Sequence, residues 1–212
     1  MRLVRLSNNM IIRVTLIALA LYATGCSTNA GTNSKTEASR IAQTDSSYTN
    51  YHRKAQRVID SLKLDKEKIY IEVSKSSYLL QLKIGEVVIK GYPVVLGFDP
   101  INDKRQEGDG CTPEGTFKIQ SKYPHKSWSK FIWFDYPNDE SRKKFEARKK
   151  KGEIPKDARI GGEVGIHGVP DKDDRIIDQK INWTLGCVSL KTADINEIYS
   201  LVKVGTKVVI EH

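Results

Sequence analysis

Short runs of β-branched and aromatic residues, separated by turn-forming residues, constrain the fold of this 212-residue chain more than any other feature. Ser76-Ser77 and Gly85-Glu86 separate the first three runs at intervals typical of hairpins, which predicts a β-meander. The later runs are bounded by Gly, Pro or Asn. Strands are expected at residues 69–73, 78–82, 87–89, 92–96, 115–119, 131–134 and 207–210. The chain is therefore expected to be mostly β, with largely antiparallel pairing.

Two or three helices complete the expected architecture. Apolar residues recur at helical spacing in residues 51–64 and again from Thr192 to Val202. Thr192 belongs to a residue type that caps helices, and Gly205 is expected to end the last helix. Residues 139–151 are strongly charged, so they are expected to form either a solvated helix or an exposed insertion.

The N-terminal 25 residues have the pattern of an export signal. Three arginines precede an apolar stretch at residues 14–23, which is too short to span a bilayer, and small residues follow it up to Cys26. The pattern predicts a lipoprotein signal at residues 1–25, with a lipid on Cys26 that anchors the exported protein to a membrane. An ordinary secretory signal with an incidental cysteine is the alternative.

Residues 26–50 are rich in Ser, Thr, Asn, Ala and Gly, and they contain too little apolar surface to fold. We expect a flexible tether here, followed by a helical segment at 51–68 and one domain at 69–212, which is long enough for a proper core. The formal net charge of +9 favours an anionic partner, and export argues against nucleic acid.

A cysteine and a histidine, each flanked by glycine, are the best candidates for chemistry. His167 lies in Gly165-Ile166-His167-Gly168, and Cys187 follows Gly186 twenty residues later. A free thiol is only about 3% ionised at neutral pH, so a nucleophilic cysteine needs an imidazole to take its proton. Two neighbouring strands, with the loop 169–183 folded outward, could bring the two side chains together. The N–H groups of Gly186 and Cys187 are candidate donors to an oxyanion.

Structural explanations for the same residues stay open at this stage. Buried cysteines are common, and a histidine on a strand is often only packed. Cys111 and Cys187 could also form a disulfide in an oxidising compartment. Paired ligand spacings such as CxxC or HExxH are absent from the sequence, so a metal site is not expected.

Several blocks, in order, resemble the YkuD-type L,D-transpeptidase catalytic domain. They are Tyr92 to Gly97, Gly108 to Gly115, Asp135 to Asn138, His167-Gly168, Thr184-x-Gly186-Cys187, the segment carrying Asp194, and Gly205-Thr206-x-Val208. The resemblance covers about residues 69–210. It implies an antiparallel or mixed β-sandwich-like fold and a monomeric enzyme that needs no cofactor, faces the periplasm or cell wall and acts on peptidoglycan stem peptides.

The resemblance also implies a role for each residue of the site. Cys187 would attack a stem-peptide carbonyl, His167 would move the proton, and the backbone carbonyl of Gly168 would orient the imidazole. Gly186, Thr184 and Ser189 would form the oxyanion and substrate-binding surface. An amine would resolve the resulting thioester by cross-linking, D-amino acid exchange or protein attachment.

Three positions depart from the family pattern. Leu185 and Ser189 stand where many members have His and Arg, and Cys111 stands where a basic residue is frequent. YafK-like relatives with altered motifs are linked to cleavage, so a peptidoglycan carboxypeptidase or amide hydrolase that uses the same cysteine is one alternative. A non-catalytic lipoprotein that binds the cell wall is another, favoured by the basic charge and the possible disulfide.

Overall fold

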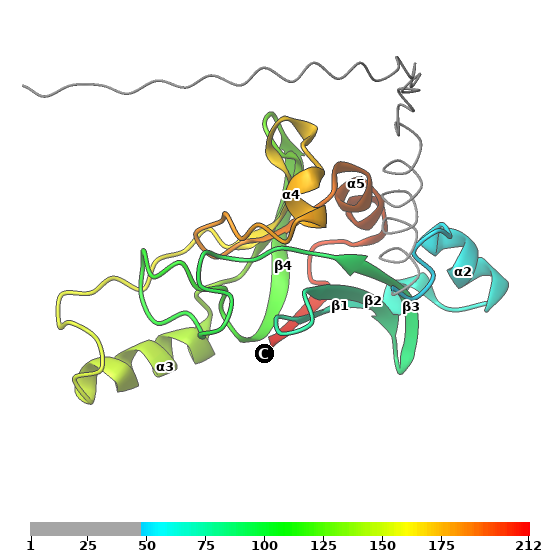
Figure 1. Cartoon of the computed structure of the whole chain (residues 1–212). Coiled ribbons are helices and arrows are strands. Elements are labelled where there is room, and N and C mark those ends of the chain that lie inside the picture. The colour runs from blue at the N-terminus through cyan, green and yellow to red at the C-terminus, as the bar shows by residue number, and fades with distance from the viewer. Residues whose placement is uncertain (1–47) are drawn as a thin grey trace, which may run out of the picture. The chain divides into compact units, whose positions relative to one another are not determined.

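A mixed β-sheet of eight strands forms the frame of the protein (Figure 1). The structure is a computed structural model that describes residues 48–212; the expected signal, Cys26 and nearly all of the tether lie outside these residues. The strand order is β3-β2-β1-β8-β4-β5-β6-β7. The strands are β1 (Ile69–Ser74), β2 (Leu79–Ile84), β3 (Val87–Pro93), β4 (Gly115–His125), β5 (Ser129–Phe134), β6 (Gly165–Gly168), β7 (Val188–Leu190) and β8 (Lys207–Glu211).

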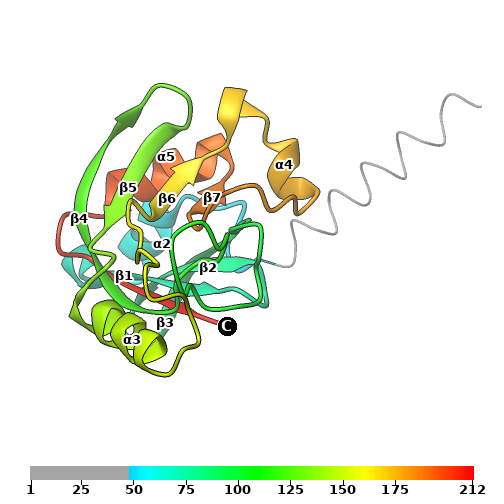
Figure 2. The ribbon, with the colours of Figure 1, turned by 90° about the vertical axis from the view of Figure 1, so that its left-hand side faces the viewer.

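The long strand β4 belongs to both halves of the sheet. Its first residues, Gly115 to Lys118, pair with β8, whereas Ile119 to His125 pair with β5. Strands β4 to β7 follow one another in Figure 2, in the order of the sheet. The mostly β architecture is confirmed, but the pairing is mixed, because β1 with β8 and β6 with β7 run parallel.

The core follows from the alternating burial of these strands. Along β1, buried and partly buried residues alternate, as expected for a strand with one covered face. Ile71 of β1 and Ile195 of α5 (Thr192–Leu201) are both fully buried in one apolar cluster, which also contains Ile59 of α2 (Ala55–Ser61). Each such side chain contributes roughly 1.5–3 kcal/mol of hydrophobic free energy when it is removed from water. Within residues 48–212, no helix is both long and apolar enough to cross a membrane.

Both ends of α5 differ from the sequence expectation. Thr192 is the first helical residue and not the cap, and its backbone N–H donates to Asp174 Oδ1 at 2.8 Å. The helix ends at Leu201 because Val202 is extended, with φ −99° and ψ 157°. Gly205, with φ +87°, instead forms the turn that leads into β8.

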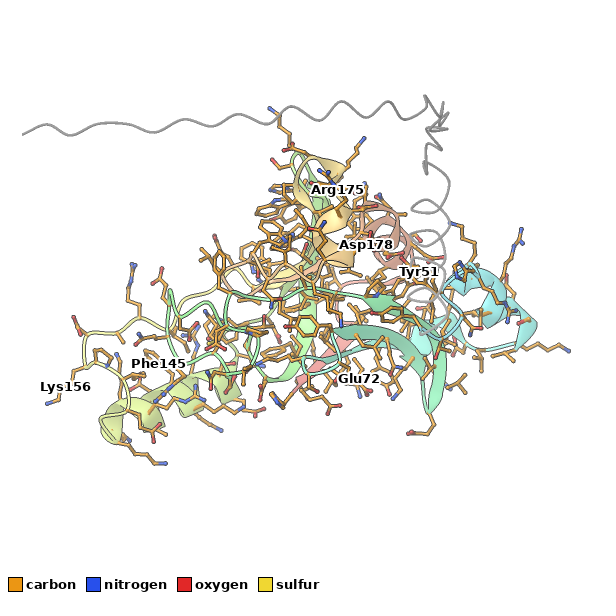
Figure 3. The ribbon with its side chains drawn as sticks, in the orientation of Figure 1. Tyr51, Glu72, Phe145, Lys156, Arg175 and Asp178 are labelled. Carbon is orange, nitrogen blue, oxygen red and sulfur yellow. The ribbon has the colours of Figure 1, made fainter. Side chains whose placement is uncertain are left out.

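The charged segment is a helix, the first of the two expected alternatives. It is α3 (Asp139–Lys150), and the side chain of Asn138 caps it by accepting a hydrogen bond from the Ser141 N–H at 3.0 Å. Phe145 is the one buried residue of α3 (Figure 3). The short helix α4 (Arg175–Asp178) and the 3₁₀ turns at Lys66–Lys68 and Pro170–Lys172 complete the described elements.

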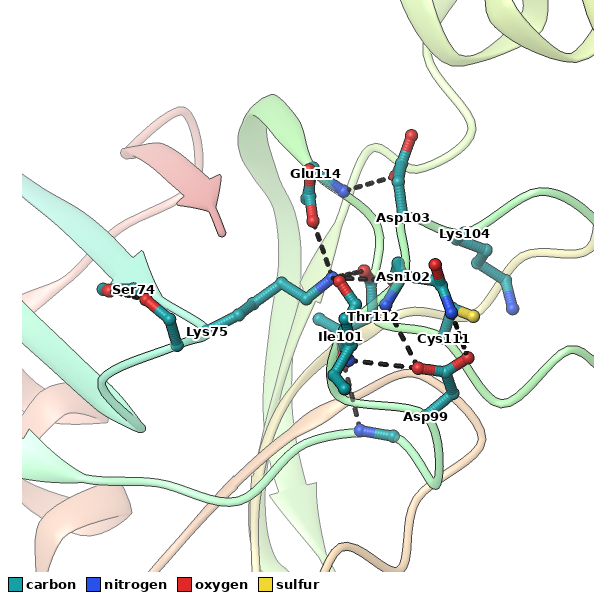
Figure 4. Close-up of polar contacts among 12 residues, drawn as sticks. Ser74, Lys75, Asp99, Ile101, Asn102, Asp103, Lys104, Cys111, Thr112 and Glu114 are labelled. Atoms are coloured by element: carbon teal, nitrogen blue, oxygen red, sulfur yellow. Dashed lines mark hydrogen bonds and ion pairs between the residues drawn. The ribbon is translucent and has the colours of Figure 1, made fainter.

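A buried lysine fixes the loop that connects β3 to β4. Lys75, in the turn after β1, is 0% exposed, and its ammonium group donates to Asn102 O and Glu114 Oε1, both at 2.7 Å (Figure 4). It also donates to Thr112 O at 3.3 Å and Ile101 O at 3.4 Å. A buried charge is tolerated only when it is paired and hydrogen-bonded, so these bonds hold the loop in one place.

Candidate active site

The parallel pairing of β6 and β7 brings the predicted pair of residues into one cavity. His167 lies opposite Ser189 in the register, and Cys187 directly precedes β7. His167 and Cys187 both line a cavity of about 740 Å³. Its wall also includes Lys104, Glu107, Tyr123, His125, Trp128, Phe131, Trp133, Glu163, Trp183, Thr184 and Leu185.

The glycines around His167 are required by the close approach of β5 and the turn before it. A Cβ at Gly165 would lie 2.4 Å from Ile132 O, and one at Gly168 would lie 2.5 Å from Trp128 O. The Gly168 N–H donates to that same Trp128 carbonyl at 3.0 Å. The Gly-x-His-Gly pattern therefore reflects tight backbone packing as well as chemistry.

One backbone carbonyl fixes the imidazole of His167. Nδ1 lies 2.8 Å from Gly168 O, and because a carbonyl only accepts, Nδ1 carries the proton and Nε2 is left as a base. The ring stacks on Trp128 at 4.3 Å and meets Trp183 edge-on at 5.3 Å. Burial lowers the pKa of His167 to about 4; the Gly168 bond opposes this shift and His125 adds to it.

The thiol of Cys187 is also neutral at physiological pH. The side chain is partly exposed, and Sγ lies 3.6 Å from Glu163 O, to which the thiol donates. Burial raises its pKa to about 11, while the Gly165 N–H and the charge of Lys104 lower the pKa and Glu163 raises it. Among the described residues, no hydrogen bond joins Sγ to His167. The pair is therefore an uncharged thiol and an uncharged imidazole.

Thr184 and Gly186 shape the turn before the cysteine. The Thr184 hydroxyl donates to Cys187 O at 2.7 Å and accepts from the Gly186 N–H at 3.2 Å. Gly186 has φ +142°, and a Cβ there would lie 2.7 Å from Cys111 O. Because the Gly186 N–H is engaged in the turn, the Cys187 N–H is the better of the two oxyanion candidates.

Ser189 lies behind the cavity wall. It is 0% exposed, its backbone exchanges hydrogen bonds with Val95 at 2.8 and 3.0 Å, and its hydroxyl is buried without a partner among the described residues. It is absent from the cavity lining, so it does not reach a substrate there. Leu185, the other departure from the family pattern, is 69% exposed at the rim of the cavity.

Several residues of the site were missed by sequence reasoning. Trp128 comes from the turn between β4 and β5, and Lys104 comes from a charged run that is indistinguishable in sequence from a solvated loop. Trp183 directly precedes Thr184, and this adjacency to the motif is the one signal that could have identified it.

Both cysteines in the described residues are free thiols. Cys111 is buried, and burial together with the charge of Asp109 raises its pKa to about 12. The disulfide considered from the sequence is therefore not present. Across residues 48–212, no group of three or more His, Cys, Asp or Glu is arranged to hold a metal ion.

Comparisons with known proteins agree with the fold and the motifs. The model of the YkuD L,D-transpeptidase catalytic domain family matches residues 68–210. Similar solved structures include the helical cell shape determining protein Pgp2 from Campylobacter jejuni, with 19% identity and a TM-score of 0.50, where the match covers 68% of this chain and 47% of that protein. An L,D-transpeptidase from Mycobacterium smegmatis matches with 14% identity and a TM-score of 0.45, over 68% of this chain and 59% of that one.

The match spans about half of the Pgp2 chain, and at this identity the likeness shows the fold alone. No curated protein matches the sequence significantly. The family model, in contrast, covers more than half of the chain and includes both His167 and Cys187. The chain therefore belongs to the YkuD family of L,D-transpeptidase catalytic domains.

Proposed function

We propose that the protein is a cysteine-dependent L,D-transpeptidase that acts on peptidoglycan stem peptides. The observation that carries this proposal is the 2.8 Å contact between His167 Nδ1 and Gly168 O, which leaves Nε2 as a base in the cavity that Cys187 also lines. A base of this kind beside a thiol is the arrangement that cysteine acyl transfer requires.

In the proposed reaction, His167 Nε2 takes the thiol proton as Cys187 Sγ attacks the carbonyl of the third stem residue. The Cys187 N–H donates to the oxyanion, and the Gly168 carbonyl stabilises the imidazolium through Nδ1. The imidazolium then protonates the leaving amine of the terminal D-alanine, which breaks the amide bond and leaves a thioester. An acceptor amine attacks the thioester, gives its proton to Nε2 and releases the thiol.

The location of the enzyme is part of the same proposal. The predicted lipid on Cys26 and the tether at residues 26–50 would keep the domain at a membrane and facing the cell wall, where the substrate lies. Without the three arginines of the predicted signal, the formal charge falls from +9 to +6, which suits a polymer with free carboxylates. The cavity of about 740 Å³ has charged and aromatic walls, as a site for a peptide substrate requires.

Mass analysis of products tests the reaction directly. The full-length chain is incubated with a disaccharide tetrapeptide and a D-amino acid, and Cys187→Ala and Cys111→Ala are run beside it. We expect the exchange product with the unmodified chain and with Cys111→Ala, but none with Cys187→Ala. Tripeptide alone would instead indicate hydrolysis. Unchanged substrate with retained sedimentation on sacculi would indicate a binding protein, and equal activity of Cys187→Ala would exclude the mechanism.

A further inference from the structure

The neutral thiol and imidazole leave a physical problem for any reaction at Cys187. Moving the thiol proton to His167 creates a negative sulfur in a cavity with largely apolar and aromatic walls, where an unpaired charge is costly. The charged and titratable groups that line the cavity with Cys187 are Lys104, Glu107, Tyr123, His125, Glu163 and His167. The single lysine among them is the residue able to compensate the charge of the sulfur.

The ammonium group of Lys104 is fixed against the turn that carries the cysteine. Its side chain is 4% exposed, and Nζ donates to Asp109 Oδ1 at 2.8 Å. Nζ also donates to the carbonyl of Leu185 at 3.5 Å, and it lies 3.6 Å from the position that a Cβ of Gly186 would take. Lys104 therefore contacts Leu185 and lies beside Gly186, the two residues that precede Cys187.

Asp109 is a rigid anchor for this lysine. Its carboxylate accepts hydrogen bonds from the backbone N–H groups of Arg105 at 2.6 Å, Gln106 at 3.0 Å and Cys111 at 3.0 Å. Burial opposes ionisation, but these bonds and Lys104 hold the pKa of Asp109 below its usual value. The loop that carries Lys104 and Cys111 is the one tied down by Lys75 (Figure 4).

The positive end of the ion pair lies against the turn that precedes Cys187. Burial is the largest cause that raises the pKa of Cys111, and the charge of Asp109 is the second largest. Asp109 is not among the groups that shift the pKa of Cys187. At Cys187, Lys104 favours the thiolate and Glu163 opposes it. An ammonium has three N–H donors, and within the described part of the chain two of those of Lys104 are engaged. One N–H of Lys104 is thus without an acceptor within residues 48–212.

We propose that Lys104, held by Asp109 and the Leu185 carbonyl, is a positioning residue that stabilises the Cys187 thiolate once His167 has taken the proton. The inference rests on the proposed function for its purpose, because a reactive thiolate matters only if Cys187 is the nucleophile. Lys104 thus supplies a cation from a loop that is distant in sequence. Ser189, two residues after the cysteine, is uncharged and buried and does not supply one.

The test measures the reactivity of each thiol separately and needs no peptidoglycan. The full-length chain is alkylated with iodoacetamide from pH 6 to 10, and the peptide that contains Cys187 is quantified by mass spectrometry. Alkylation follows the thiolate fraction, and one unit of pKa changes this fraction tenfold below the pKa. We expect Lys104→Met to slow alkylation of Cys187 by about tenfold at pH 8 and Lys104→Arg to retain most of the rate.

Lys126→Met is the matched control, because it removes one positive charge from an exposed position near the cavity. It should leave the Cys187 rate unchanged. Lys104→Met leaves Asp109 without its partner. If this prevents folding, the double variant Lys104→Met with Asp109→Asn removes both charges, and it should slow the alkylation of Cys187 in the same way. Circular dichroism checks folding in each case.

Two results would overturn the role of Lys104. One is an unchanged alkylation rate in a folded Lys104→Met variant; if KM for the tetrapeptide rose at the same time, Lys104 would bind substrate instead. The other is an equal slowing in Lys126→Met. Failure of the proposed function is distinguishable, since alkylation of Cys187 can depend on Lys104 even when no stem-peptide product forms.

Discussion

At the scale of single residues, the environment of His167 decides what chemistry the site can perform. The imidazole is 2% exposed, and Trp128 and Phe131 stack on it at 4.3 and 5.8 Å. Aromatic neighbours of this kind solvate an imidazolium poorly, so the neutral ring is favoured in the resting protein. The ring is thus unprotonated across the whole physiological range, as a general base must be before it acts.

The titration of His167 can be observed directly. Burial lowers its pKa to about 4, so its ring resonances should not move between pH 8 and 5.5 and should begin to shift only below about pH 5. Nuclear magnetic resonance of the histidine-labelled full-length chain measures this shift, and His167→Gln assigns the resonance. Titration near the ordinary value of about 6.5 would contradict the buried, ring-enclosed environment.

The two candidate catalytic residues were easier to identify from the sequence than their surroundings. Cys187 and His167 stand out because each lies in a glycine-flanked motif. Lys104 and Trp128 come from loops that only the tertiary fold brings to the cavity, and no local pattern marks them. Ser189 is expected from the sequence to contact substrate, but burial of its strand places it behind the cavity wall. Which face of a three-residue strand is covered depends on distant partners, so the sequence alone does not reveal it.

At the scale of elements, the β3–β4 loop is held by one buried lysine. Lys75 donates to three backbone carbonyls of the loop and to Glu114, and its side chain is 0% exposed. The same loop carries Lys104 to the cavity, and its Cys111 carbonyl packs against Gly186. The position of the loop, and with it the charge near the nucleophile, therefore depends on a residue in a different hairpin.

Replacing Lys75 should destabilise the protein far more than replacing an outer lysine. We expect Lys75→Met to lower the free energy of unfolding by about 3–5 kcal/mol, because Glu114 and buried carbonyls lose their donor. Lys83, paired with Glu72 at 3.1 Å on a partly exposed face, is the control; Lys83→Met should cost less than about 1 kcal/mol. Urea unfolding measures both values. Equal losses would show that the buried lysine does not hold the loop.

Strands were easier to predict than helix ends or pairing. The β-branched runs at Ile69–Ser74 and Lys207–Glu211 are strands because their side chains suit a half-buried pleated surface. Their parallel pairing was not predicted, since partner choice is made by segments far apart in the sequence. The start of α5 was also wrong by one residue, because Asp174 binds the Thr192 N–H from outside the helix.

At the scale of the whole molecule, buried polar contacts join the N-terminal segment to the far end of the chain. Tyr51 donates to Asp194 at 2.9 Å, and Glu197 accepts hydrogen bonds from Lys90 at 2.8 Å and Tyr92 at 3.0 Å. These contacts connect the segment before α2 and strand β3 with helix α5. Burial raises the pKa of Asp194 to about 6; Tyr51 and Lys90 oppose this shift.

The raised pKa of Asp194 predicts a pH-dependent loss of stability. The folded chain binds the proton of Asp194 more tightly than the unfolded chain does. Protonation of Asp194 therefore stabilises the folded state fully below about pH 4. This stabilisation, up to roughly 3 kcal/mol, is lost as the pH rises through about 6. Asn at this position still accepts from Tyr51 but does not titrate. Asp194→Asn should therefore be more stable than the unmodified protein at pH 7.5, by about 1 kcal/mol, and equal to it or less stable at pH 4.

Urea unfolding at the two pH values measures this difference. Comparing variant with unmodified protein at each pH cancels the opposite contributions of Glu197 and Asp109, whose pKa values are lowered. A variant that is less stable at both pH values by the same amount would mean that Asp194 serves only as a hydrogen-bond acceptor.

The parallel pairing of β6 with β7 has an evolutionary consequence. The proposed base and nucleophile are positioned by adjacent strands, so the intervening segment at residues 169–183 does not itself define their separation. Descendants of this chain can vary the exposed part of that segment, and so acquire new acceptors, while His167 and Cys187 keep their places. Substrate specificity can therefore change through one part of the gene while another part keeps the arrangement of His167 and Cys187.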